Sequence, residues 1–110
     1  MATVPANPPA IEAVLGTAET ARILGVHPRT VERRRKAVRH PGLLETQRMA
    51  KLRQIWSKRL ELHTAENAGK WLRSSVPALG SRCPLEVMTE DGGLDRVLDM
   101  LARMSRGIPS

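Results

Sequence analysis

The chain has 110 residues, with 18 Lys and Arg against 11 Asp and Glu, one Cys, two Trp and neither Phe nor Tyr. The single thiol excludes an internal disulfide, and the three His at positions 27, 40 and 63 lie too far apart to form a structural zinc site, so no metal or other cofactor is expected. No apolar run approaches the roughly 18 residues of a membrane span, and the first basic residue is Arg22, which excludes a charged signal peptide and predicts a cytoplasmic protein.

The N-terminal half is predicted to form four helices after a flexible arm. Three prolines and the lack of charge indicate the arm over residues 1–10. Apolar residues at helical spacing predict helices over residues 11–15, about 18–24, about 28–38 and about 44–62. Gly25 is expected to close the second helix, and Pro28 to open the third with His27 as its N-cap.

The C-terminal half is predicted to hold three further helices. Thr64 caps one that runs through Leu72, an irregular loop follows over residues 74–81, and Pro84 starts a brief helix that ends near Met88. A glycine turn precedes the last helix, which spans residues 94–105. Its expected buried side consists of Leu94, Val97, Leu98, Leu101 and Met104. Because no segment shows the alternation of a strand, we predict an all-α fold.

The positive charge is concentrated in one segment. Residues 22–59 carry twelve basic and two acidic side chains, a net charge of +10, against −2 for residues 1–21 and −1 for residues 60–110. Concentrated Lys and Arg are typical of a phosphate-binding surface, because binding releases counterions. The lack of Phe and Tyr leaves few stacking platforms for single strands or RNA, so the expected partner is duplex DNA. The alternative is a solvated helical face without a ligand.

Residues 17–38 resemble a helix-turn-helix. The positions that carry the resemblance are Ala21 where the helices approach, Leu24 in the core, Gly25 at the turn, and Val26 and Val31 packing the second helix onto the first. The outer face of that second helix is expected to enter the major groove. The predicted DNA-binding residues are Arg29, Thr30, Glu32, Arg33, Arg34, Arg35 and Lys36.

These residues are expected to divide into base-reading and phosphate-binding groups. The outward Arg side chains can bond the guanine edge, whereas Arg34 and Arg35 flank the buried face and are assigned to phosphates. Glu32 either accepts from a cytosine amine or forms a surface pair with Lys36 four residues on. Arg34 occupies a position that is usually aliphatic in this motif. Because so short a motif binds weakly alone, we expect two copies on a two-fold operator.

Residues 71–109 carry a second and denser pattern. It comprises Trp71 and Leu72 at a helix end, a Pro-Ala-Leu-Gly loop at residues 77–80, Pro84 and Leu85 opening a short helix, Thr89 before a turn at Gly92 or Gly93, and a closing helix with Val97, Leu101, Arg103 and Gly107. This pattern resembles the toxin-binding domain of the Xre/MbcA/ParS antitoxin family. Ser81 stands where the family usually has a second glycine.

The resemblance implies an antitoxin paired with a toxin of the RES-domain type, an NAD-consuming enzyme that acts as an ADP-ribosyltransferase or degrades NAD. It implies that the C-terminal half covers the toxin's active site, that the N-terminal half binds the operon's own promoter as a repressor, and that the chain itself is not an enzyme. A homodimer or a hetero-oligomer with the toxin is expected. The toxin-facing residues would be Arg82, Arg96, Asp99, Arg103 and Arg106, with Gly107, Ile108, Pro109 and Ser110 as a short tail that enters the cleft.

The expected organisation is an arm over residues 1–10, a helix-turn-helix region with a long connecting helix over residues 11–62, and a toxin-binding domain over residues 63–110. The alternative is a plain DNA-binding regulator whose C-terminal half only dimerises. This alternative does not explain the patterned loop after Val76. The charges on the last helix are then ordinary solvated groups. Trp71 is expected to pack inward, and Cys83 to be structural rather than nucleophilic.

Overall fold

The chain folds into helices joined by short connections. The structure is a computed structural model that describes residues 9–31 and 42–105. Its elements are α1 (Ile11–Leu15), α2 (Thr17–Leu24), α4 (Leu43–Leu60), α5 (Ala65–Leu72), the 3-10 helix η1 (Pro77–Leu79), α6 (Pro84–Met88) and α7 (Gly93–Ser105). Residues 28–31 are also helical, and the remainder of the helix predicted to about residue 38 lies outside the described residues. The predicted all-α fold is confirmed, since the described residues form only one isolated β-bridge.

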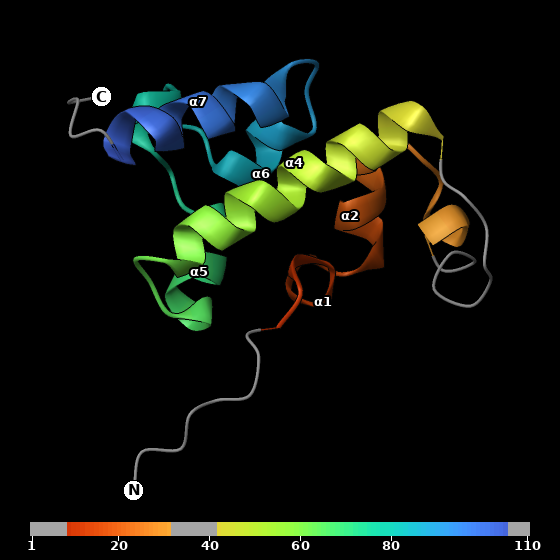
Figure 1. Ribbon diagram of the computed structural model, residues 1–110, viewed down its shortest axis with the longest axis horizontal. Helices are drawn as coiled ribbons and strands as arrows, with labels where there is room; N and C mark the ends of the chain where they lie inside the picture. Colours follow the sequence, from red (N-terminus) through yellow and green to blue (C-terminus); the bar gives the residue numbers. More distant parts are fainter. Residues whose placement is uncertain (1–8, 32–41, 106–110) are drawn as a thin grey trace, which may run out of the picture.

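The long helix α4 is the central element. It runs diagonally through the molecule, with α7 on one side, α1 and α2 on the other and α5 near its C-terminal end (Figure 1). The short helix α6 packs against α7 and α5. Residues from both ends of the sequence therefore meet on α4. No helix within the described ranges combines the length and apolar character needed to cross a bilayer.

Local signals in the sequence set three of the helix ends. The Thr64 hydroxyl accepts the backbone N–H of Asn67 at 3.1 Å, which is the N-cap predicted for α5. The ring of His27 caps the helix that begins at Pro28, because its Nδ1 accepts the N–H of Arg29 at 3.1 Å. Gly25 ends α2 in the left-handed conformation with φ +74°. These predictions are confirmed.

One large hydrophobic core joins the two halves of the sequence. Ile11 and Leu15 from α1 lie in the same cluster as Leu52 and Ile55 from α4 and Val97 from α7. The core therefore includes residues from both sides of the boundary predicted between residues 62 and 63. The helix α4 lies before this boundary and packs against α1 and α2 as well as against α5 and α7. Burial of this apolar area is the main source of stability, since every named helix except α4 and α7 is too short to persist alone.

Two side-chain contacts attach the start of the described chain to α4. The indole Nε1–H of Trp56 donates to the Pro9 carbonyl at 2.9 Å. The Arg53 guanidinium lies 3.3 Å from the Glu12 carboxylate. Trp56 is buried, so its N–H requires a partner inside the protein. The last two residues of the predicted arm are exposed, with the Pro9 carbonyl bonded to Trp56, and its first eight residues lie outside the described residues.

The buried side of α7 differs from the prediction in its last turn. Leu94, Val97 and Leu101 are buried and Leu98 is partly buried, but Met104 is 44% exposed. The prediction that Met104 belongs to the core is wrong, although the helical face was assigned correctly. Met104 lies in the final turn of α7, and its side chain is not covered there by other described elements. Met100, which the periodicity analysis left out, is 5% exposed and belongs to the core.

Candidate functional site

The helix-turn-helix packing predicted from the spacing is present. Ala21, Leu24 and Val31 form a separate small hydrophobic cluster, with Val26 and Met49 packed against it. The backbone N–H of Val26 donates to the Ala21 carbonyl at 3.0 Å, as in the common glycine-ended helix motif. The angle between α2 and the helix that begins at Pro28 is thereby fixed by a tight turn and an apolar contact.

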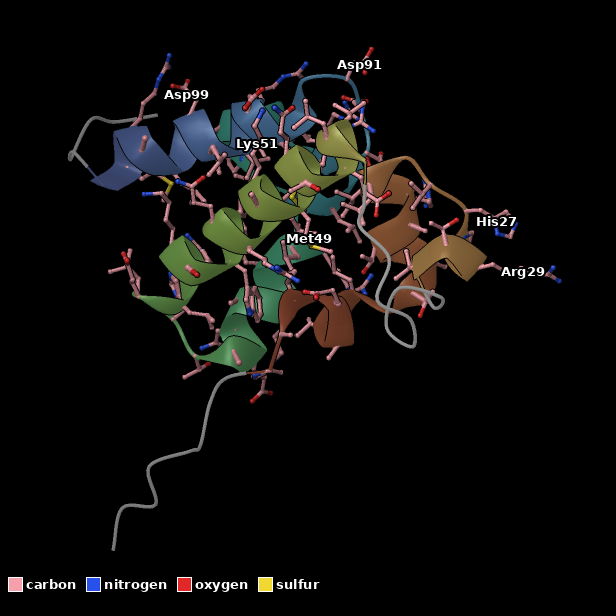
Figure 2. The ribbon with its side chains drawn as sticks, turned by 45° about the vertical axis from the view of Figure 1, so that its right-hand side comes forward. His27, Arg29, Met49, Lys51, Asp91 and Asp99 are labelled. Atoms are coloured by element: carbon pink, nitrogen blue, oxygen red, sulfur yellow. The ribbon has the colours of Figure 1, made fainter. Side chains whose placement is uncertain are left out.

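Two residues of the predicted DNA-binding set lie in the described part of the chain, and one of them projects away from the rest of the protein. Arg29 is exposed and projects outward beside His27 at the far end of the molecule (Figure 2). Thr30 is half-buried, and its backbone N–H donates to the His27 carbonyl at 2.9 Å. The other predicted DNA-binding residues, which are Glu32, Arg33, Arg34, Arg35 and Lys36, lie outside the described residues.

Part of the basic segment contacts other groups of the same chain, and the Lys51–Asp95 pair among these contacts lies at the surface. Lys51 forms a 2.8 Å ion pair with Asp95, and Arg48 donates to the Leu24 carbonyl at 3.0 Å. The Arg59 guanidinium lies 4.4 Å from the centroid of the Trp71 ring, and burial lowers its pKa from the ordinary arginine value. Net charge alone therefore overstates the cationic surface available to a polyanion. Sequence reasoning missed these internal roles because the partners lie far along the chain.

A groove between η1 and α7 brings three predicted toxin-facing residues together. Its volume is about 200 Å³, and it is lined by Ala78, Leu79, Arg96, Asp99, Met100 and Arg103. Leu79 and Met100 are buried, whereas the charged residues are exposed around them. Arg103 lies 3.2 Å from Asp99, one helical turn before it on α7. Asp99 projects from the outer side of α7 (Figure 2). The arrangement is an apolar floor with a charged rim, which is typical of a protein-binding surface.

Arg82 connects this face to the turn before α7. Its guanidinium lies 2.6 Å from Glu90 and 3.8 Å from Glu86, and Glu90 also lies 3.7 Å from Arg96. The hydrogen bond from Arg82 lowers the pKa of the Glu90 carboxyl below its ordinary value, and the same bond raises the pKa of Arg82. The predicted residues Arg82, Arg96, Asp99 and Arg103 thus lie along one side of the molecule. Arg106, Gly107, Ile108, Pro109 and Ser110 lie outside the described residues.

The loop before α6 has a defined backbone. Val76 and Arg82 form a single antiparallel bridge, and the Ser75 hydroxyl donates to the Ser81 carbonyl at 2.7 Å. Gly80 and Ser81 have φ values of +69° and +61°. Ser81 therefore takes the left-handed conformation that favours glycine, at the position where a second glycine was expected. The loop was predicted to be irregular, but a 3-10 turn at residues 77–79 organises it.

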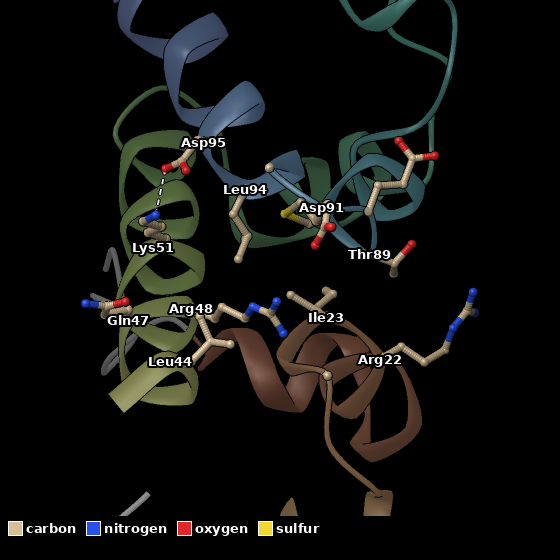
Figure 3. Close-up of a pocket in the computed structure, with 14 residues that line it drawn as sticks. Arg22, Ile23, Leu44, Gln47, Arg48, Lys51, Thr89, Asp91, Leu94 and Asp95 are labelled. Carbon is tan, nitrogen blue, oxygen red and sulfur yellow. Dashed lines mark ion pairs between the residues drawn. The ribbon is translucent and has the colours of Figure 1, made fainter. Parts of the chain in front are cut away.

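A second groove lies where the helix-turn-helix meets the C-terminal half. It measures about 210 Å³ and runs between the end of α2, the first half of α4 and the turn that joins α6 to α7. Arg22 and Arg48 lie on the α2 and α4 side, and Thr89, Asp91 and Asp95 lie across from them (Figure 3). Basic and acidic side chains thus face one another between the two predicted regions.

Among the remaining candidate residues, His27, His63, Cys83 and Trp71 lie in the part of the chain that the structure describes. No three His, Cys, Asp or Glu side chains there form a metal-binding group. His27 and His63 are exposed, and Cys83 is a half-buried free thiol. Trp71 is partly buried against the core, so it packs inward on one face and carries the Arg59 guanidinium on its ring.

Comparison with known proteins identifies the family. Residues 51–107 match the family described as the antitoxin Xre/MbcA/ParS C-terminal toxin-binding domain. A chain in the crystal structure of the M. tuberculosis MbcT-MbcA toxin-antitoxin complex is similar, with 28% identity and a TM-score of 0.69 over 92% of this chain and 91% of that one. No curated protein sequence matches. The match covers more than half of the chain and includes the groove at α7. This chain therefore belongs to the Xre/MbcA/ParS family of antitoxins.

Proposed function

We propose that this chain neutralises a RES-domain toxin, an NAD-consuming enzyme that acts as an ADP-ribosyltransferase or degrades NAD, by covering its active site. The observation that carries the proposal is the family match over residues 51–107, which contain both η1 and α7. The similarity to a chain of a toxin-antitoxin complex over nearly its whole length supports it. The antitoxin itself is not an enzyme.

The groove between η1 and α7 is the proposed toxin-binding surface. Its floor, formed by Leu79 and Met100, accepts an apolar side chain from the toxin. Arg96 and Arg103 at its rim would meet acidic groups or the phosphate-binding part of an NAD pocket. Among the residues that the structure describes, both pair with exposed carboxylates, so exchanging those partners for groups on the toxin costs little free energy.

We also propose that the helix-turn-helix binds duplex DNA in the operon's own promoter and represses it, with two copies of the chain on a two-fold operator. The packing of Ala21, Leu24 and Val31 supports a fixed motif, and the exposed Arg29 supports a DNA-facing outer side. The alternative, a regulator whose C-terminal half only dimerises, predicts no toxin partner.

Co-expression with the adjacent gene tests the toxin-binding function. We expect the chain to restore growth and to elute with the gene product in size-exclusion chromatography. An Arg103→Glu variant should weaken the complex by about tenfold or more, because it removes a rim cation and places a carboxylate beside Asp99.

Lys70→Glu is the matched control for this variant. Lys70 forms the same kind of exposed pair, four residues after Glu66 on α5, but it does not line the groove. Equal loss in both variants would contradict the assignment of the surface. A chain that elutes alone, with no RES-type reading frame beside its gene, would favour the plain regulator.

A further inference from the structure

Arg48 attaches the turn of the helix-turn-helix to the central helix. Its side chain leaves α4 and its Nη1 donates to the carbonyl of Leu24 at 3.0 Å, across 24 residues of sequence. Leu24 is the last residue of α2, and Gly25 follows it in the turn. In the close-up of the groove, the Arg48 guanidinium extends from α4 towards the end of α2 (Figure 3).

The Leu24 carbonyl requires a partner from outside its own helix. At the end of α2, the N–H groups of Gly25 and Val26 satisfy the carbonyls of Arg22 and Ala21, which leaves the final carbonyl without an intrahelical donor. A guanidinium is well suited to this position, because it supplies a charged donor at the negative end of the helix dipole. Arg48 therefore completes the C-terminal cap of α2.

Gly25 provides the room for this contact. A Cβ atom at position 25 would overlap the Nη1 of Arg48, and the φ of +74° already favours glycine. The neighbouring Met49 packs against both the small cluster of the helix-turn-helix and the large core. Two consecutive residues of α4 thus hold the turn, one by a hydrogen bond and one by apolar contact.

We infer that Arg48 is a positioning residue for DNA binding, which acts by fixing the turn and hence the direction of the helix that begins at Pro28. The inference rests on the proposed DNA-binding function. Arg48 belongs to the basic segment, so sequence alone would place it among the phosphate contacts. Its hydrogen bond is partly buried inside the protein, which assigns its charge to the turn rather than to the duplex.

The two roles differ in how DNA affinity depends on salt. An arginine that neutralises a phosphate contributes about 0.9 to the slope of log affinity against log salt concentration. An arginine that only positions the reading helix changes the fraction of molecules that are competent to bind, and therefore the affinity at every salt concentration, without changing the slope.

The test uses Arg48→Met, which keeps an unbranched apolar stem but removes the guanidinium donor. Lys51→Met is the matched control, because Lys51 lines the same groove on the same helix but pairs with Asp95 on α7. Both are titrated with a duplex from immediately upstream of the gene and with an unrelated duplex of equal length, at several salt concentrations. Arg48→Lys tests rescue.

We expect Arg48→Met to weaken binding to the upstream duplex by about tenfold, with the salt slope of the parent and unchanged toxin binding. Lys51→Met should bind like the parent, and Arg48→Lys should recover part of the loss. A slope that falls by about 1 in Arg48→Met would make it a phosphate contact and overturn the inference. Equal losses in both Met variants, or none in Arg48→Met, would also overturn it.

Hydrogen exchange separates failure of this inference from failure of the proposed function. The Val26 amide, which bonds to the Ala21 carbonyl in the turn, should exchange about tenfold faster in Arg48→Met, while amides in the middle of α7 keep the parent rate. If the parent protein binds no duplex, the proposed DNA-binding function is wrong. Faster exchange of the Val26 amide in Arg48→Met would still support the role of Arg48 in the turn. Unchanged exchange at Val26 would overturn that role regardless of DNA.

Discussion

The two adjacent glycines before α7 are required for different physical reasons. Gly92 has a φ of +71° and open space around it, so a glycine is required there for the backbone conformation and not for lack of room. Gly93 is the first residue of α7 and is buried, and a Cβ atom there would overlap the backbone carbonyl oxygen of Val87. A carbonyl in the peptide backbone cannot rotate aside as a side chain does. Replacing Gly93 therefore requires α6 and α7 to move apart.

We expect Gly93→Ala to lower the free energy of unfolding by about 2 kcal/mol. Overpacking of a rigid site costs about 3 kcal/mol at the upper end of its usual range, and the better helix propensity of Ala returns at most about 1 kcal/mol. Gly92→Ala should cost only about 1 kcal/mol, the ordinary cost of a left-handed backbone for a residue with a Cβ.

Thermal unfolding followed by circular dichroism measures both variants. A loss of 2 kcal/mol in a domain of this size corresponds to a fall in Tm of about 10 °C, and Gly92→Ala should lose about half as much. The order of the two variants is the critical result. Parent-like stability of Gly93→Ala, or a larger loss in Gly92→Ala, would refute the reasoning from the Val87 contact.

Three further results are expected. In NMR titration, the Glu90 carboxyl should have a pKa below the ordinary glutamate value, and Arg82→Ala should raise this pKa towards that value, with Arg96 still lowering it. The stability from the Arg82–Glu90 pair is present above the ordinary pKa and is lost as pH falls through the lowered one. Met100→Ala should lower the free energy of unfolding, measured by denaturant titration, by about 2 to 5 kcal/mol. Met104 is exposed, so Met104→Ala should change this free energy by no more than about 0.5 kcal/mol. Equal effects of the two substitutions would contradict the burial pattern of α7. Arg29→Ala should relax the preference for the upstream duplex over an unrelated duplex, and an unchanged preference would remove Arg29 from the base-reading group.

Deleting residues 107–110 tests the predicted tail. If this segment enters the toxin's cleft, the truncated chain should bind the toxin more weakly in a co-purification assay and restore growth less fully. Because α7 ends at Ser105, the deletion leaves every described helix intact. Full neutralisation by the truncated chain would show that the tail is not required.

The local structure of the chain was determined largely by its sequence. Thr64, Gly25 and Pro84 set helix ends through hydrogen bonding and backbone conformation that depend only on near neighbours, and the structure confirms each of them. The packing positions of the helix-turn-helix were equally predictable, because Ala21, Leu24 and Val31 follow a spacing set by one tight turn. The family pattern over the C-terminal half supplied the functional class.

Only the tertiary structure decided which charges are available to partners and which are engaged internally. Arg48 bonds Leu24 across 24 residues, and no rule of local spacing connects the two positions. The face of α7 that contains Met104 followed from helical periodicity, but its exposure depends on where the surrounding elements end. Propensity and periodicity report the neighbours along the chain, whereas ion pairs, burial and the close approach at Gly93 depend on contacts that form only when distant segments pack together.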